Sequence, residues 1–378
     1  MAACAPPSGG RMKVTPRLFR HFHMIWMCDL SVDSMKQIFK SILEGFIESN
    51  PNKELFAGVD ELMNNALDLY NKIRKEKLPT PSKSHYTFNL RDLSKVVQGM
   101  LQSNVESITD KHTFVNLWVH ETSRQFRDRL LGEDVEWFDK EINKVYEYKF
   151  NLGKPAFTID ELIFTSVVEK QYKMVVDFPL LTKKINDRLD QYNTANRASP
   201  MNLVFFTDAI NHFCRIARIL SQERGNALLV GLGGSGRQSL TKLVSNYLNY
   251  PINTLQIGKG YGAEQFQKNI GEILLKVGNT NENNSQIFLF SDTQILEESF
   301  LEDINNVLNN GEVPNLFTYD QIGQIFNTLK EYAKSAKKSY LENRDSIYQF
   351  FVDNIRDRLR IVLCFSPVGE GFRNRCRQ

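Results

Sequence analysis

The sequence predicts an α/β fold in which a three-layer domain with a parallel sheet follows an all-helical region. An apolar run, Ala227–Val230, leads into the glycine-rich loop 231–236, and a helical pattern begins directly after that loop. Two later apolar runs, residues 287–290 and 361–365, alternate with amphipathic segments. This alternation is typical of a parallel sheet covered by helices on both faces. Residues 31–150 instead repeat their apolar side chains at helical spacing, so we expect a small helical domain there.

The composition is typical of a soluble globular protein and excludes several function classes. The 378 residues are 42% hydrophobic and 24% charged, which is enough apolar mass for two or three domains. A net charge of +3 is too small to indicate nucleic acid or an anionic membrane as a partner. The five cysteines are scattered without metal-ligand spacing, which suits a reducing compartment. We see no signal peptide or membrane-spanning run, so the sequence predicts a cytoplasmic protein.

The first 200 residues are expected to consist mainly of helices. A loop rich in basic and aromatic side chains leads to a predicted strand around residues 24–27. A helix should begin near Ser31 or Asp33, either of which can serve as its N-cap. Further helices are predicted over residues 59–77, 90–97, 113–131 and 180–192, and Asn89 is the expected N-cap of the second of these.

Strands and helices alternate in the second half of the chain. A helix over residues 207–222 precedes the first strand and the glycine loop. The predicted strands after the loop are residues 253–257, 287–290 and 361–365, and the intervening helices cover 264–277, a stretch from Glu298, and 319–358. This order is the βαβ repetition of a parallel sheet.

Two phosphate-binding motifs fit the loop Gly-Leu-Gly-Gly-Ser-Gly at residues 231–236. It matches the dinucleotide pattern GxGxxG, and it matches a P-loop in which Arg237 and Gln238 replace the usual Lys and Ser/Thr. A dinucleotide site needs an acidic residue at the end of the second strand, but residues 256–259 there read Gln-Ile-Gly-Lys. A P-loop site needs an acid after a later strand, which Asp292 supplies, and a polar tip on a strand between the two, which Ser366 supplies. The P-loop is therefore favoured over the dinucleotide pattern.

At this point the residues resemble a known family, the AAA+ motor ring of dynein heavy chains of the axonemal type. Residues 6–11 (PPSGGR) and 86–94 (YTFNLRDLS) are similar to the end of the third module of that ring. Residues 231–239 (GLGGSGRQS), 290–294 (FSDTQ) and 366–370 (SPVGE) are similar to the fourth module. The resemblance runs nearly end to end and implies an AAA+ P-loop fold.

The resemblance also implies a division of the chain. Residues 1–30 would be the tail end of a preceding AAA+ large subdomain, and residues 31–150 its helical small subdomain. Residues 151–200 would be a helical linker. Residues 201–378 would be a P-loop large subdomain that is incomplete at its C-terminus.

The expected site residues fall into three groups. The loop and first turn of the following helix should hold the nucleotide phosphates: Gly231, Gly233, Gly234, Ser235, Gly236, Arg237, Gln238 and Ser239. By resemblance, the backbone around Leu203 and Val204 lines the adenine. Asp292 is the expected magnesium ligand, and Ser366 is expected to face the γ-phosphate. Also by resemblance, Arg373 and Arg375 face the nucleotide of a neighbouring module, which Arg91 approaches from the helical subdomain.

The catalytic set is incomplete. Arg237 can supply charge, but its guanidinium needs more room than a lysine, and Gln238 is a poor magnesium ligand. A working site needs an Asp that binds the metal and, next to it, a Glu that polarises the attacking water. If Ser291 takes the Asp position, Asp292 takes the Glu position. If Asp292 takes the Asp position, Thr293 takes the Glu position. Either register loses one role, so we expect ATP or ADP binding with slow or absent hydrolysis.

The resemblance implies a regulatory module in a motor that moves cilia and flagella along microtubules. Its partners would be the neighbouring AAA+ modules and, through the full-length heavy chain, intermediate chains, light chains and microtubules of the axoneme. Two alternatives stay open: a structural ring segment with an empty pocket, and a dinucleotide-dependent oxidoreductase.

Overall fold

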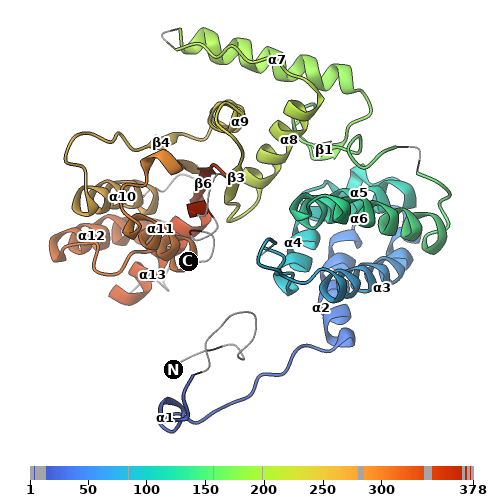
Figure 1. Cartoon of the computed structure of the whole chain (residues 1–378), viewed down its shortest axis with the longest axis horizontal. Coiled ribbons are helices and arrows are strands. Elements are labelled where there is room, and N and C mark those ends of the chain that lie inside the picture. Colours follow the sequence, from blue (N-terminus) through green and yellow to red (C-terminus); the bar gives the residue numbers. More distant parts are fainter. Residues whose placement is uncertain are drawn as a thin grey trace. The chain divides into compact units, whose positions relative to one another are not determined.

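The structure is a computed structural model that describes residues 4, 14–83, 85–155, 157–197, 199–279, 285–335, 343–367, 371–372 and 375. The chain divides into two compact units (Figure 1). Unit 1 comprises Met1–Phe164 and Glu169–Val175, and unit 2 comprises Thr165–Val168 and Val176–Gln378. None of the helices in the described part of the chain has the length and apolar character needed to cross a bilayer.

Unit 1 is built almost entirely from helices. Its α-helices are α1 (Pro16–Phe19), α2 (Val32–Ile47), α3 (Lys53–Glu76), α4 (Leu90–Met100), α5 (Lys111–Gln125) and α6 (Glu133–Lys144). Shorter turns are η1 (Val105–Ser107), η2 (Arg127–Arg129) and the π-helical η3 (Val145–Lys149). The two-residue strands β1 (Phe164–Thr165) and β2 (Lys173–Met174) pair with each other, and the division between the units falls within β1. Helices α2 and α3 pack together, as do α4 and α5, around a core that includes Trp118 and Tyr70.

The helix starts in unit 1 follow local capping chemistry. The Ser31 side chain accepts a hydrogen bond from the Ser34 N–H, and Asp110 does the same for Thr113. Asn89 forms a capping box with Asp92. The Asn89 side chain accepts a hydrogen bond from the Asp92 N–H, and the Asp92 side chain accepts one from the Asn89 N–H. The predicted caps Ser31 and Asn89 are therefore confirmed.

One expectation for unit 1 is wrong, and one of its helices was not predicted individually. Residues 23–31 run without regular structure, so the strand predicted around residues 24–27 is absent, and Met24 and Met27 are 67% and 84% exposed. A strand needs a neighbour to pair with, and none of the described strands lies beside these residues. Helix α6 was missed, because the acidic stretch at its start hides the apolar positions Phe138 and Ile142 that it buries.

Unit 2 carries a four-stranded parallel sheet. Its helices are α7 (Phe178–Ala195), α8 (Thr207–Ser221), α9 (Arg237–Leu248), α10 (Ala263–Gly278), α11 (Ser299–Asn310), α12 (Tyr319–Ser335) and α13 (Arg344–Arg358). Its strands are β3 (Ala227–Val230), β4 (Ile252–Thr254), β5 (Gln286–Ser291) and β6 (Leu359–Phe365), and the turn η4 (Asp292–Gln294) follows β5. The strand order is β3-β6-β5-β4, so β6 lies between the strand before the glycine loop and the strand before Asp292, as predicted.

Alternating side chains of the central strands bury against different helices. Phe288, Phe290 and Ile361 belong to a core that includes side chains of α10 to α13. Arg360, one residue from Ile361, donates to the carbonyl of Leu220 in α8, which places α8 on the other face. Helices therefore cover both faces of the sheet, and the predicted three-layer α/β architecture is confirmed (Figure 1).

Candidate functional site

The glycine loop joins β3 to α9 at the carboxyl edge of the sheet. The Gly231 N–H donates to the Phe365 carbonyl of β6 at 3.1 Å, and the Ser235 N–H closes a turn on the Leu232 carbonyl at 3.2 Å. Gly234 and Gly236 have φ angles of +82° and +79°, a backbone region that favours glycine. Gly236 is the N-cap of α9 and offers no capping side chain, so the first N–H groups of this helix are free to bind an anion.

Close packing inside the loop also explains its first glycine. A Cβ atom at Gly231 would lie 2.8 Å from the Ser235 Oγ, so the Ser235 side chain would have to shift to make room for it. Gly233 has open space around it and an exposed backbone. The loop therefore combines a tight base with an exposed rim, as a phosphate cradle requires.

Arg237 is anchored to the base of this loop. Its guanidinium donates from Nη1 to the Phe365 carbonyl and from Nη2 to the Leu232 carbonyl, the latter at 3.3 Å. The arginine thus connects the loop to the end of β6. A fixed positive charge beside the free N–H groups of α9 adds to the attraction for an anion.

Asp292 lies on the same edge and binds the tip of the neighbouring strand. Its Oδ2 accepts a hydrogen bond of 2.7 Å from the Ser366 N–H, which follows β6. Burial raises the pKa of the Cys364 thiol to about 11, while the Arg237 charge opposes this rise and the Asp292 charge adds to it. The structure therefore brings together Arg237, Asp292 and Ser366, three residues predicted for the site.

Ser291 forms a capping box at the start of η4. It is buried, and its hydroxyl lies 2.8 Å from the Thr293 Oγ1 and 3.1 Å from the Gln294 Oε1. Gln294 in turn donates to the Leu255 carbonyl beyond β4 at 2.7 Å. Sequence reasoning missed Gln294, although Ser-x-x-Gln is the pattern of a capping box. The neighbouring Asp292, by contrast, bonds to the backbone that follows β6, and both registers considered for the Asp and Glu positions stay open.

The other predicted residues are not all drawn into this cluster. Gln238 is exposed and Ser239 half-buried in the first turn of α9. Leu203 is half-buried and Val204 is 84% exposed in the segment before α8. Their proposed contact with adenine remains a prediction.

Two of the three predicted arginines, Arg91 and Arg375, belong to the described part of the chain. Arg91 is exposed in the first turn of α4, in unit 1. Arg375 donates from Nε and Nη2 to the Glu298 Oε1, at 3.2 and 3.0 Å, within unit 2. Arg373 lies outside the described residues. A role for any of them toward a neighbouring module remains a prediction.

A magnesium ion is implied at this site by the resemblance to AAA+ P-loop modules. Magnesium demands a compact octahedral shell of oxygen ligands, usually a carboxylate, a hydroxyl and phosphates. Asp292 uses its Oδ2 to accept the Ser366 N–H, and the Ser291 hydroxyl is engaged in its own network. This leaves the Asp292 Oδ1 and, at the position after Arg237, Gln238 in place of the usual hydroxyl. The residues present do not fit a tightly held magnesium ion.

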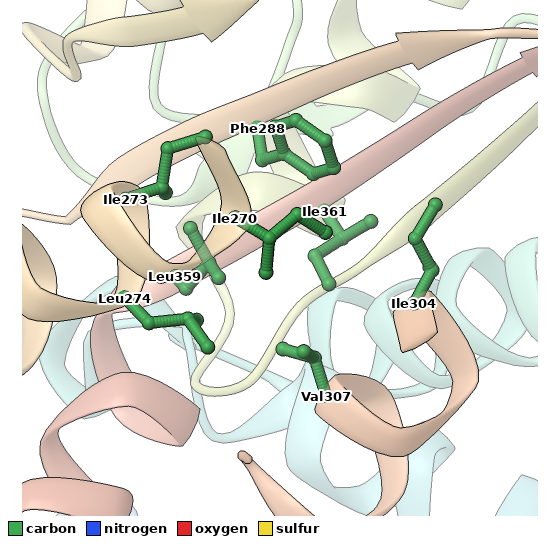
Figure 2. A pocket seen from close by; sticks show the side chains of 8 residues that line it. All are labelled: Ile270, Ile273, Leu274, Phe288, Ile304, Val307, Leu359 and Ile361. Carbon is green, nitrogen blue, oxygen red and sulfur yellow. The ribbon is translucent and has the colours of Figure 1, made fainter. Parts of the chain in front are cut away.

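A separate cavity lies inside unit 2 and carries no chemistry. Its volume is about 10 Å³, and α10, α11, β5 and β6 enclose it (Figure 2). All the lining side chains are apolar: Ile270, Ile273, Leu274, Phe288, Ile304, Val307, Leu359 and Ile361. A space of this size without polar groups is a gap in packing rather than a ligand site.

Comparisons with known proteins agree along the whole chain. The family model described as P-loop containing dynein motor region D4 matches residues 201–378, and the AAA+ lid domain model matches residues 62–157. The chain is 43% identical to human dynein axonemal heavy chain 6 and 40% identical to mouse dynein axonemal heavy chain 1. It is 37% identical to the Chlamydomonas reinhardtii dynein-1-beta heavy chain, flagellar inner arm I1 complex. Each match covers 100% of this chain but only 9%, 9% and 8% of the respective relative.

Proposed function

The chain belongs to the axonemal dynein heavy-chain family, and from this premise we propose that it is a segment of the motor ring whose residues 201–378 bind ATP or ADP. One observation carries the proposal. The loop between β3 and α9 places free helix N–H groups beside Arg237, at the edge of the sheet where Asp292 and Ser366 meet. In open parallel sheets this edge is where ligands bind.

The role of the segment follows from its incomplete catalytic set. A module that binds nucleotide without turning it over can still regulate its neighbours, because occupancy changes the boundary between modules. The segment would comprise the end of one module, its helical subdomain over residues 31–150, the linker 151–200 and most of the next module. Its immediate partners would be neighbouring modules of the ring. Through the full-length heavy chain it would contribute to ATP-driven movement on axonemal microtubules in cilia and flagella.

The test is a titration of the 378-residue chain with fluorescent ATP, fluorescent ADP and NADPH. We expect saturable binding of the adenine nucleotides and none of NADPH. Binding of NADPH alone would instead support the oxidoreductase alternative. Against that alternative, β4 ends at Thr254 and is followed by Leu255 and Gln256, so it lacks the carboxylate that holds a ribose.

One observation favours a second candidate, a structural ring segment with an empty pocket. The Arg237 guanidinium has partners within the chain, the carbonyls of Leu232 and Phe365, so a role in holding the loop to β6 accounts for this residue as well. The same titration separates the two candidates, since a purely structural segment would bind none of the three ligands.

We expect hydrolysis by this chain to be slower than about one turnover per second, the low end of ordinary enzyme rates. The reason is that Asp292 is a single carboxylate and Gln238 replaces the metal-binding hydroxyl. Steady-state phosphate release from ATP measures this. The Gly236→Val variant provides the background from contaminating ATPases. Release at or above that rate in the wild-type chain alone would contradict the expectation.

Replacing Arg375 with alanine is expected to leave the nucleotide affinity of the chain unchanged. The side chain pairs with Glu298, which is 54% exposed, so the loss of stability should not exceed about 1 kcal/mol. The matched control is Glu298→Ala, which breaks the same ion pair but keeps the arginine. In a complete ring, Arg375→Ala but not Glu298→Ala should slow turnover at the preceding module. Weaker binding in the isolated chain would show that Arg375 serves its own module.

A further inference from the structure

We infer that the glycine-loop site binds its nucleotide without a divalent cation, with Arg237 supplying the positive charge that magnesium supplies in an ordinary P-loop. This inference rests on the proposed nucleotide binding and specifies how the phosphates are neutralised. It concerns adenine nucleotides as the ligand class.

Arg237 lies at the junction of the glycine loop, α9 and the end of β6. Arg237 is the first residue of α9, and its guanidinium reaches both the loop carbonyl of Leu232 and the β6 carbonyl of Phe365. It thus lies at the base of the cradle that Gly231–Gly236 forms, beside the free N–H groups of the helix. A guanidinium stays charged at any physiological pH, and it has five N–H donors. Two of these donors hold the Leu232 and Phe365 carbonyls, so the charge and the remaining N–H groups are what Arg237 can offer to a phosphate. A lysine in the same place would act as a point charge.

The two ligand positions of an ordinary P-loop metal shell are altered in this chain. In P-loop enzymes the metal is held by the Ser/Thr after the lysine and by an acid on a neighbouring strand. Here Gln238 takes the hydroxyl position and is exposed, and Asp292 commits its Oδ2 to the N–H of Ser366, which leaves one carboxylate oxygen, Oδ1, for a metal. The adjacent Ser291 hydroxyl cannot replace either ligand, because it is buried and lies within hydrogen-bond distance of Thr293 and Gln294.

The negative charge of Asp292 affects phosphate binding differently with and without a cation. If a cation sat between Asp292 and the phosphates, the carboxylate would strengthen binding by holding that cation. Without a cation, the carboxylate faces the phosphates directly and repels them. Its structural role, accepting the Ser366 N–H, needs only an oxygen and no charge. The two modes of binding therefore predict opposite effects for removing this one charge.

The experiment measures the affinity of the 378-residue chain for fluorescent ADP in excess magnesium and in EDTA. We expect the two dissociation constants to agree within about threefold, well below the tenfold that 1.4 kcal/mol would produce. A larger weakening in EDTA would overturn the inference while leaving the proposed nucleotide binding intact. No saturable binding in either buffer would overturn both. This comparison uses the wild-type chain and so does not depend on any variant folding.

The variant Asp292→Asn supplies the second arm. Asparagine keeps an oxygen for the Ser366 N–H and removes the charge, so we expect ADP to bind more tightly, by about threefold or more, in both buffers. The matched control is Asp320→Asn, the same change at an exposed position in the first turn of α12, which should leave the affinity unchanged. Weaker binding of Asp292→Asn in magnesium would show that the carboxylate holds a cation, and the inference would be wrong.

Discussion

Replacing Gly236 with valine is expected to abolish nucleotide binding, with a loss of affinity of at least about a hundredfold. Gly236 has a φ of +79° and forms the N-cap of α9, so its backbone aims the first N–H groups of the helix at the cradle. A β-branched residue is strained there by about 1–3 kcal/mol and would rotate the backbone away. Titration with fluorescent ADP measures the loss.

The fold itself should survive this change. A Cβ atom at Gly236 would meet only the Leu240 Cγ, at 4.0 Å, so the variant creates strain but no clash in the core. The matched control is Gly260→Val. Gly260 has a φ of +78° and open space around it, and it lies after β4, outside the loop. Both variants should lose similar stability in thermal unfolding, whereas Gly260→Val should keep its affinity for ADP. Equal affinity in the Gly236→Val variant and the wild type would refute the proposed site.

Replacing Asp134 with alanine should cost about 3–5 kcal/mol of unfolding free energy, the largest stability effect that we expect in unit 1. Its carboxylate accepts hydrogen bonds from Lys77, Lys83 and Tyr86 at 2.8, 2.5 and 2.9 Å. The side chains of Asp134 and Lys77 are only 15% and 13% exposed, so the variant leaves a charged amine with little access to water. Urea unfolding measures the loss.

The control for this prediction is Asp68→Ala, which removes the partner of Lys149. That ion pair is exposed, with 65% of the Asp68 side chain accessible, so its loss should not exceed about 1 kcal/mol. A similar loss of stability in both variants would contradict the argument from burial.

The contribution of Asp134 should also depend on pH. Burial pushes the pKa of this carboxyl upward, but the hydrogen bonds from Lys77, Lys83 and Tyr86 outweigh burial and hold the pKa well below its usual range. A carboxyl whose pKa is lowered on folding stabilises the protein above its unfolded pKa of about 4. The difference in stability between wild type and Asp134→Asn should therefore be constant from about pH 5 to 7 and shrink as the pH falls below about 4. A difference that grows at acid pH would show that the linkage has the opposite sign.

Local patterns in the sequence were sufficient for most of the elements. The order of three elements was predicted correctly: the strand Ala227–Val230, the glycine loop and the helix that starts at Arg237. The signals for them are local, because the spacing of apolar residues changes from strand-like to helical within a few residues of the glycines. The capping box at Asn89 is local for the same reason. The placement of β6 between β3 and β5 was also predicted, because a polar strand tip is needed between the loop and the acid.

Contacts between distant segments could not be predicted in this way. Arg237 was expected to supply charge to a phosphate, and nothing in the sequence indicated that its guanidinium donates to the Phe365 carbonyl, 128 residues later. Asp292 and Ser366 meet across 74 residues, and this contact decides which of Ser291 and Asp292 reaches the neighbouring strand. The apolar pattern of β5 shows that the strand is buried, but it does not show at which residue the strand ends. It is therefore compatible with both assignments of the Asp and Glu positions at residues 291–293.

The sequence by itself therefore determined the family, the α/β architecture and the position of the glycine loop, because each depends on residue types at short, fixed spacings. Only the tertiary structure decided that Arg237 anchors the loop, that Asp292 binds the tip of β6, and that residues 23–31 form no strand. These outcomes depend on strand register and on the presence of a pairing partner, which are set by packing between segments far apart in the chain.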